Sequence, residues 1–487
     1  MNKPIRRVSV FCLVLVLALM IRVNWVQGVD AASLNDNANN RRGMIEAYSY
    51  PRGSIIVGGQ AVTKSQLVNG NQFKYRESFT NGPLYAPVTG YSSPIFSSSL
   101  LESVESQYLD GTASDLAVNN FESLITGKQK QGADVVTTID AKVQAAAYNA
   151  LTQQKKIGAA VALDPTTGAI LALVSAPSYD PNVLASGDTS GTTYTSLLNA
   201  PGNPMLNRAL RQTYPPGSTF KLITSAAALE TGLVTDINAP TDSPNPYPLP
   251  GTDISLPNES ASDPCTNATL NTALTYSCNT VYGKLGVEVG DARMAQEAQK
   301  FGFNATRYIP VRVDPSTFAT GINQSQTAMS SIGQFDTSAT PLQMAMVASA
   351  ICNNGVLMTP YLVSEVRAGD QSVVGTPTQP TQLSVATTPQ VASEIQTMMV
   401  NVVQNGTGVT AQIPGVTVGG KTGTAQNGTN NANTPYAWFV SYAKNSAGKE
   451  IAVAVVVESS DTSRGDVSGE ELAAPIAKQM MEAYVGQ

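Results

Sequence analysis

The chain contains no histidine among its 487 residues, which excludes a large share of enzyme chemistry. Without imidazole there is no Ser-His-Asp triad, no His-ligated zinc or haem, and no histidine general base. Any proton acceptor must therefore be a lysine, a glutamate, an aspartate, a tyrosine or a chain terminus. The question of function reduces to which side chain one of these groups can activate.

Charged residues are scarce as well. Asp, Glu, Lys and Arg make up 13% of the chain, about half of the usual ~25%. This composition argues against disorder driven by high charge. The net charge of −6 and the lack of a Lys/Arg stripe argue against a nucleic-acid partner. The length predicts two or three domains with a sizeable core.

The N-terminus combines a basic start, formed by Lys3, Arg6 and Arg7, with the apolar run Val8–Ile21. That run is shorter than the ~20 residues of a spanning helix, so a cleaved signal peptide and an uncleaved signal-anchor both remain open. A poor cleavage site around residues 29–31 and an interfacial Trp25 favour the anchor. We therefore expect residues 1–30 to be a single-pass anchor in the cell membrane, with the catalytic part outside the cytoplasm.

The four cysteines fit an exported chain. Cys12 lies in the anchor, and Cys352 falls in an apolar helical run where a core thiol is expected. Cys265 and Cys278 are 13 residues apart in the exported part. We predict that these two form a disulfide, the alternative being two separate buried thiols.

The order of elements predicts an α+β protein. Residues 31–134 read as a linker and a β-rich, non-catalytic module without a defensible nucleophile–base pair. Residues 135–487 read as a helix, two strands, a helical middle, three strands and a helix, which indicates an antiparallel sheet packed between helices with an inserted helical subdomain. The expected helices are 141–154 and 470–484, the strands 159–163, 169–175, 416–424, 437–443 and 451–458, and the surface loop 240–265.

The first chemical candidate is Ser218-Thr-Phe-Lys221. Residues 218–230 read as one helix that is apolar on nearly every side and therefore buried. Ser218 would lie at its N-terminus, among free backbone N–H groups, with Lys221 one turn further on. Burial lowers the pKa of a lysine, so a neutral Lys221 would take the Ser218 proton. The similar spacing at Ser441–Lys444 follows a strand, where we expect exposed loop residues.

The second candidate is Ser277-Cys278-Asn279, which lies between apolar helical turns. A Ser277 hydroxyl there would relay protons between Lys221 and a leaving amine. Asn279 would bind an amide carbonyl or hold Lys221. Taken alone, the element is also typical of an ordinary helix cap.

The third candidate is Lys421-Thr422-Gly423-Thr424, which follows Val416–Gly420. Together these residues read as a strand whose glycines, Gly419 and Gly420 included, would let a ligand backbone approach. Lys421 would add positive charge beside Lys221, and the hydroxyls of Thr422 and Thr424 would bind a carboxylate. Backbone N–H groups of Thr424 and Ser218 would together form an oxyanion hole.

The three elements in this order, with spacings of 59 and 144 residues, resemble the motifs of penicillin-binding proteins and serine β-lactamases. Longer stretches resemble class B penicillin-binding proteins of the FtsI type, and Arg52-Gly53 resembles the start of their non-catalytic module. These stretches are Leu206–Ala209, Tyr214–Lys221, Ser331–Phe335, Thr340–Met344 and Asn405–Gly408.

The resemblance implies a peptidoglycan D,D-transpeptidase without metal or cofactor. Ser218 would attack the D-Ala–D-Ala end of a stem peptide, release the last D-Ala and pass the acyl group to an amine of a neighbouring stem. β-Lactams would acylate the same serine. The family also implies partners in the membrane, namely a glycan polymerase and proteins of division or elongation.

Three alternatives share these motifs. A β-lactamase is disfavoured because no Glu-x-x-Leu-Asn follows Ser277–Asn279 to supply a deacylation base. A D,D-carboxypeptidase differs only in using water as the acceptor. A penicillin-binding sensor or scaffold would be joined to further membrane segments, and no second apolar run of spanning length occurs.

Overall fold

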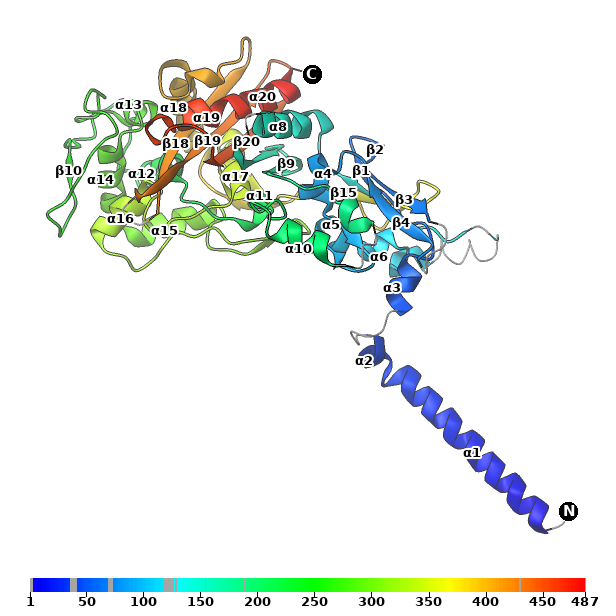
Figure 1. Ribbon diagram of the computed structural model, residues 1–487. Coiled ribbons are helices and arrows are strands. Elements are labelled where there is room, and N and C mark those ends of the chain that lie inside the picture. Colours follow the sequence, from blue (N-terminus) through cyan, green and yellow to red (C-terminus); the bar gives the residue numbers. More distant parts are fainter. Residues whose placement is uncertain are drawn as a thin grey trace.

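The computed structural model describes residues 3–35, 42–68, 73–117, 127, 129–153, 155–186, 190–428 and 431–486. Helix α1 (Lys3–Gly28) projects from the rest of the chain (Figure 1). Its 26 residues span roughly 39 Å at ~1.5 Å per residue, more than the ~30 Å hydrocarbon core of a bilayer. Past the apolar run, Asn24 Nδ2 donates to the Met20 carbonyl and Arg22 pairs with Asp30.

Helix α1 is long and apolar enough to cross a membrane. Its apolar side chains are exposed along its whole length, from Ile5 to Trp25. Such a surface is stable in lipid rather than in water. The short helices α2 (Ala31–Asn35) and α3 (Arg42–Ala47) follow it toward the folded body.

The β-rich module is built around a five-stranded sheet that also uses strands from far along the chain. Its order is β16-β15-β7-β1-β2, so residues beyond 360 complete a sheet that starts near residue 55. The strands are β1 (Ile55–Val57), β2 (Gln60–Ala61), β7 (Asp134–Thr137), β15 (Val363–Arg367) and β16 (Val373–Val374). The other elements here are β3 (Thr63–Leu67), β4 (Tyr75–Phe79), α4 (Gly82–Thr89), β5 (Ser92–Ser93), β6 (Ser97–Ser98), α5 (Leu100–Val104), α6 (Ser106–Leu109) and η1 (Ser114–Leu116).

The central sheet is antiparallel throughout, as predicted, in the order β18-β19-β20-β8-β9. Its strands are β8 (Ile157–Leu163), β9 (Ile170–Ala176), β18 (Thr417–Asn427), β19 (Asn433–Lys444) and β20 (Glu450–Ser459). Helices α8 (Ala141–Gln153) and α20 (Ala474–Val485) cover one face, and α17 (Pro341–Cys352) covers the other. Along β20, Val453 and Val455 pack on the α8–α20 side, whereas Ala454 and Val456 pack on the opposite side.

A helical subdomain is inserted between β9 and β18, next to the end of the sheet where β18 forms the edge (Figure 1). Its core helix α12 (Lys221–Glu230) is buried because it is apolar on nearly every side. Around it lie α13 (Leu270–Thr275), α14 (Asn279–Val289), α15 (Asp291–Lys300), α16 (Gln324–Ser331) and α18 (Pro389–Asn405). The remaining elements are α9 (Asn182–Ala185), α10 (Thr192–Leu198), α11 (Arg208–Arg211), β12 (Arg307–Tyr308), β13 (Arg312–Val313), β14 (Val356–Met358), β17 (Gln382–Val385), η3 (Val409–Ala411) and η5 (Arg464–Asp466).

Three sequence-based expectations need correction. The single helix predicted for 218–230 begins as a 3-10 turn, η2 (Gly217–Phe220), and becomes α-helical only at Lys221. The last helix is divided into α19 (Gly469–Leu472) and α20, because Pro475 lacks an N–H and can only occupy the first turn of α20. The loop 240–265 contains the small ribbon β10 (Tyr247–Pro248) and β11 (Ser255–Leu256).

The predicted disulfide between Cys265 and Cys278 is present, with a Cα–Cα distance of 5.5 Å. It ties the loop that contains β10 and β11 to the residue before α14. The prediction of Cys352 as a core thiol is also confirmed, since this side chain is buried and burial raises its pKa.

Candidate active site

Ser218 is buried in the turn η2, which packs against the edge strand β18 beside Gly423 and Ala425. The backbone before it is held from two sides: Gly217 N–H donates to the Gly333 carbonyl at 2.9 Å, and Trp438 Nε1 donates to the Pro215 carbonyl at 2.9 Å. Gly333 adopts a φ of +74°, and a Cβ there would lie 2.1 Å from the Gly217 oxygen. Only glycine permits this close approach, which fixes the turn that carries Ser218.

The approach segment to Ser218 is anchored on the central sheet through Glu458 of β20. Tyr214 Oη donates to Glu458 Oε2 at 2.9 Å, and Arg208 Nε donates to the same oxygen at 2.8 Å. The guanidinium of Arg208 is buried, and the carboxylate of Glu458 supplies the negative charge that pairs with it. Arg208 and Tyr214, which both precede Ser218 in the chain, therefore share one acceptor on the sheet.

Lys221 begins α12, and its amine is the centre of the site. Nζ lies 2.6 Å from the Ser277 carbonyl oxygen, 2.7 Å from Asn279 Oδ1 and 3.2 Å from Ser277 Oγ. The ring of Tyr282 lies beneath it, with its centroid 5.6 Å from Nζ. Lys221 is thus hydrogen-bonded to the second motif. Of the two roles expected for Asn279, the structure contains the contact that holds Lys221.

Both lysines of the motifs are buried, and their environment lowers the pKa of both amines. Burial lowers the pKa of Lys221 well below its ordinary value, and the positive charge of Lys421 lowers it further. Burial lowers the pKa of Lys421 to about 8. The carboxylate of Glu259 raises the pKa of both lysines and opposes these effects. Lys221 is thus the better proton acceptor, while Lys421 keeps most of its charge near neutral pH.

The start of α14, with Asn279 and Thr280, is held by the loop 240–265. Ser277 has a φ of +61°, an uncommon conformation for a residue with a side chain. Asn279 Nδ2 donates to the Pro257 carbonyl at 3.2 Å, and Thr280 N–H donates to Asn258 Oδ1 at 3.1 Å. These bonds and the adjacent disulfide hold the second motif rigidly against Lys221.

The third motif lies on β18. Lys421 Nζ donates to the Thr422 carbonyl at 3.0 Å, and the hydroxyls of Thr422 and Thr407 lie 2.6 Å apart. A Cβ on Gly423 would lie 3.0 Å from the Pro216 oxygen, so glycine here lets η2 lie directly on the strand.

The glycines before the third motif have another role than expected. The room that Gly419 and Gly420 leave is filled by the rings of Tyr442 and Phe439 on β19, not left for a ligand. Small residues at these positions therefore serve the packing of the sheet.

The structure brings most, but not all, of the expected contacts together. Lys221, Ser277 and Asn279 form one hydrogen-bonded group, and Lys421 acts on Lys221 through its charge. Within the described ranges, the Ser218 hydroxyl makes no hydrogen bond to Lys221 or to another residue.

Three contributors were missed by sequence reasoning. Tyr282 lies one helical turn after Asn279, and that spacing was a usable signal. Thr407 belongs to a run that had no assigned chemistry, although it contacts Thr422. Glu259 is exposed in a polar loop, where no local pattern pointed to the lysines.

The expectation of exposed loop residues at the similarly spaced pair Ser441–Lys444 is wrong. Ser441 is buried inside β19 rather than exposed in a loop, and Lys444 pairs with Glu450. Residues three apart on a strand point to opposite faces, so this pair cannot work together.

Comparison with known proteins places this geometry in a family. Residues 158–482 match the penicillin binding protein transpeptidase domain, and residues 52–135 match the penicillin binding protein A dimerisation domain. The chain is 39% identical to peptidoglycan D,D-transpeptidase PbpA of Mycolicibacterium smegmatis, over 99% of either chain. It is 38% identical to the protein of that name in Mycobacterium tuberculosis, again over 99% of either chain.

Solved structures agree. Penicillin-binding protein A of M. tuberculosis, as a ceftriaxone acyl-enzyme complex, matches with a TM-score of 0.85 and 38% identity, over 91% of this chain and 100% of that chain. A D,D-transpeptidase domain from Eggerthella lenta matches with a TM-score of 0.74 and 31% identity, over 89% and 98%.

The chain belongs to the penicillin-binding protein transpeptidase family, in its class B. Its activity is that of a serine-type peptidoglycan D,D-transpeptidase. The predicted fold, an α+β transpeptidase domain preceded by a non-catalytic module and one apolar N-terminal helix, is confirmed.

Proposed function

We propose that Ser218 is the nucleophile of this transpeptidase and that Lys221 is its general base. The observation that carries the assignment is the dry, hydrogen-bonded amine of Lys221, whose pKa burial and Lys421 lower. In the neutral form its two N–H groups serve the Ser277 carbonyl and Asn279 Oδ1. Its lone pair is then left to take a proton from a hydroxyl.

The reaction follows from these positions. Ser218 Oγ forms a bond to the penultimate D-Ala carbonyl carbon of a stem peptide, and its proton passes to Lys221. The proton then travels through Ser277 Oγ, 3.2 Å from Nζ, to the departing D-Ala amine. An amine of a neighbouring stem attacks the acyl-enzyme, loses its proton to the same base and restores the Ser218 hydroxyl.

The substrate is proposed to bind along β18. This strand is at the edge of its sheet, and an edge strand offers backbone groups to an extended peptide. Lys421, Thr422 and Thr424 supply a positive charge and hydroxyls for the terminal carboxylate, and Gly423 keeps the nucleophile turn against the strand. Backbone N–H groups of Ser218 and Thr424 are the proposed oxyanion donors.

β-Lactams are proposed to acylate Ser218 as mimics of D-Ala–D-Ala. The support comes from relatives, since penicillin-binding protein A of M. tuberculosis is known as acyl-enzyme complexes with imipenem and with penicillin G. At 38% identity over the whole of those chains, the same chemistry is expected here.

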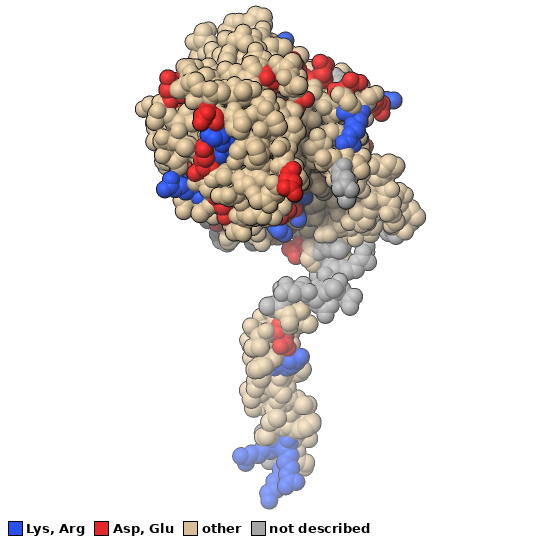
Figure 2. Space-filling view, turned by 90° about the vertical axis from the view of Figure 1, so that its left-hand side faces the viewer, with Lys and Arg blue, Asp and Glu red and all other residues tan. Residues whose placement is uncertain are grey.

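The chain is proposed to divide into an anchor at 1–30, a linker and pedestal or dimerisation module at 31–134, and the transpeptidase domain at 135–487. Helix α1 would cross the cell membrane once, with Lys3, Arg6 and Arg7 in the cytoplasm and the catalytic domain outside. Figure 2 shows blue basic side chains at the free end of α1 and a tan apolar length above them. A membrane glycan polymerase and division or elongation proteins are the proposed partners.

Mass spectrometry of the penicillin-treated protein tests the nucleophile. We expect a single adduct on Ser218, no adduct in Ser218→Ala, and normal labelling in the matched control Ser446→Ala, whose serine also precedes a lysine by three residues. An adduct on any other serine contradicts the assignment. Turnover of a D-Ala–D-Ala stem peptide would distinguish the enzyme from a sensor, which does not turn over. Transfer of the acyl group to an added amine, rather than to water alone, would distinguish a transpeptidase from a carboxypeptidase.

A further inference from the structure

A second hollow lies away from Ser218, at the junction of the N-terminal module and the transpeptidase domain. It has a volume of about 450 Å³, within the ~300–1,000 Å³ typical of small-molecule sites. Its walls come from α4, α5 and the end of β9, together with α10 and the segment that leads into α11. None of the motif residues lines it, so it is a separate site.

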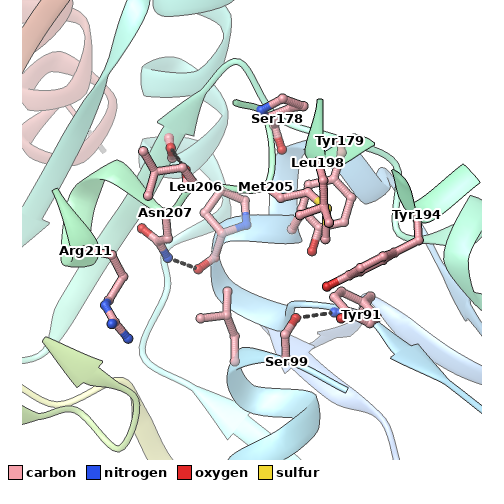
Figure 3. Close-up of a pocket in the computed structure, with 15 residues that line it drawn as sticks. Tyr91, Ser99, Ser178, Tyr179, Tyr194, Leu198, Met205, Leu206, Asn207 and Arg211 are labelled. Atoms are coloured by element: carbon pink, nitrogen blue, oxygen red, sulfur yellow. Dashed lines mark hydrogen bonds between the residues drawn. The ribbon is translucent and has the colours of Figure 1, made fainter. Parts of the chain in front are cut away.

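Tyrosine rings form one side of this pocket. Tyr91 stands edge-on to both Tyr179 and Tyr194, with ring centroids 6.4 Å apart in each pair. Phe96 stacks on the ring of Tyr194, with ring centroids 5.1 Å apart and an interplanar angle of 9°. Figure 3 shows the hydroxyl ends of Tyr179 and Tyr194 directed toward the same part of the pocket. The rings are thus held in place and offer both apolar faces and hydroxyl groups.

Two polar side chains of the pocket each have one atom without a hydrogen-bond partner in the described part of the chain. Asn207 is only 7% exposed; its Nδ2 donates to the Pro87 carbonyl at 2.8 Å, as the dashed line in Figure 3 marks, but its Oδ1 accepts no hydrogen bond. The Oγ atom of Ser178 is also buried and has no partner among the residues that the structure describes. Buried polar atoms are normally satisfied. A rotation of either side chain toward the pocket would therefore gain a hydrogen bond from a ligand that carries hydroxyl or N–H groups.

The charges of the lining residues indicate which class of ligand the pocket would bind. Among the lining residues that the structure describes, none is a carboxylate and one is charged: Arg211, which is partly exposed and paired with Asp314 at 3.1 Å. The site therefore suits a neutral or weakly anionic ligand rather than a cation. A pyranose ring combines the required features, because its C–H face packs on aromatic rings while its hydroxyl and amide groups bond to side chains such as Asn207 and Ser178.

We propose that this pocket binds a sugar unit of the glycan strand whose stem peptides the enzyme cross-links. The proposal depends on the activity already assigned, since the glycan is part of the same polymer. The segment Leu206–Arg211 lines the pocket and leads within seven residues to Ser218. A strand held here would keep its stem peptides near the nucleophile.

Calorimetric titration of the full-length, detergent-solubilised protein with chitotetraose, a β-1,4-linked N-acetylglucosamine tetramer, tests this site. We expect saturable binding that Tyr194→Ala weakens at least tenfold and that Leu198→Arg, at a rim position 50% exposed, abolishes. The matched control is Tyr308→Ala, a tyrosine 66% exposed outside the pocket, which should bind as the wild type does.

Penicillin labelling at the wild-type rate shows that each variant is folded and that loss of sugar binding is independent of Ser218. No binding of chitotetraose by the wild type overturns the proposal, as does wild-type binding by the labelling-competent Leu198→Arg protein. Displacement of chitotetraose by a sugar-free stem peptide also overturns it, since the pocket would then bind peptide.

Discussion

The amine of Lys221 and the amide oxygen of Asn279 lie 2.7 Å apart, although the two residues are 58 positions apart in the chain. An amide oxygen only accepts hydrogen bonds, so Asn279 orients the amine without giving it a proton. The buried amine is thereby aimed by a neutral group, which preserves the lowered pKa that a carboxylate in the same place would reverse.

Substitution of Asn279 tests this distinction. Asn279→Ala removes one hydrogen bond and should slow acylation by fluorescent penicillin about tenfold, corresponding to ~1.4 kcal/mol. Asn279→Asp places a negative charge beside Lys221 and raises its pKa, so the rising limb of the pH–rate profile should move to higher pH. Identical profiles for the two variants would show that charge at this position does not matter.

The roles of Lys221 and Lys421 should be distinguishable in the pH dependence of the acylation rate. In the proposed mechanism acylation needs neutral Lys221, so we expect its rate to rise with pH. The mechanism also needs charged Lys421 for the ligand carboxylate, so the rate should fall as pH passes about 8, the value to which burial lowers the pKa of Lys421. Lys421→Ala should lose the falling limb and move the rising limb to higher pH, because a charge that lowers the pKa of Lys221 is gone.

Lys221→Ala should lower the rate of acylation across the whole range, by the ~10²–10⁴-fold that a general base contributes. The second-order rate constant for penicillin, measured from acid to alkaline pH, distinguishes the two variants. Wild-type rates in both would disprove the proton transfer.

Glu259 is expected to tune the same profile in the opposite direction. Its carboxylate raises the pKa of both lysines, so Glu259→Gln should move both limbs to lower pH. The matched control is Asp253→Asn, an exposed carboxylate of the same loop that does not act on either lysine. Because Glu259 is exposed, added salt should shrink the difference between Glu259→Gln and wild type; a salt-independent difference would contradict a charge effect.

Loss of the disulfide should weaken both the fold and the site. In the chain-entropy model, closing a loop of about this length stabilises a protein by ~3 kcal/mol. A Cys265→Ala/Cys278→Ala protein should therefore melt at lower temperature and acylate more slowly, because the loop that holds Asn279 and Thr280 is no longer tied down. Cys352→Ala controls for the loss of a buried thiol alone. Reductant should slow the wild type and leave the double variant unchanged; equal sensitivity would contradict this account.

Glu458→Gln should destabilise the protein through Arg208. Removing the partner of a buried charge costs ~3–5 kcal/mol, and the lower end is expected because Glu458 itself is 31% exposed. Thermal unfolding measures the effect, and Glu288→Gln, which breaks the exposed helical pair with Lys284, should cost only ~0.3–0.5 kcal/mol. Acylation should slow as well, because Tyr214 and Arg208 would then share a neutral amide oxygen, a weaker acceptor than the carboxylate that holds the approach to Ser218.

Much of the architecture followed from local patterns. The continuous apolar run Ile451–Val457 predicts a strand buried on both faces, and the all-round apolar α12 predicts a core helix; both are what the structure contains. The predicted start of the helix at residue 218 was wrong, because a single turn can be α-helical or 3-10 and the local sequence does not decide between them. Residues 217–220 form a 3-10 turn because Gly217, Gly333 and β18 meet there, and only the fold brings these segments together.

From the sequence alone came the absence of imidazole, the order of three motifs and the prediction that a buried lysine must act as the base. Tertiary structure decided which atoms meet: Asn279 orients Lys221, Thr407 contacts Thr422, and the exposed Glu259 opposes the neutralisation of two buried amines. The reason is physical. Burial and periodicity act over a few residues and can be read along the chain, whereas Coulomb interactions and hydrogen bonds depend on distances that exist only after distant segments have packed.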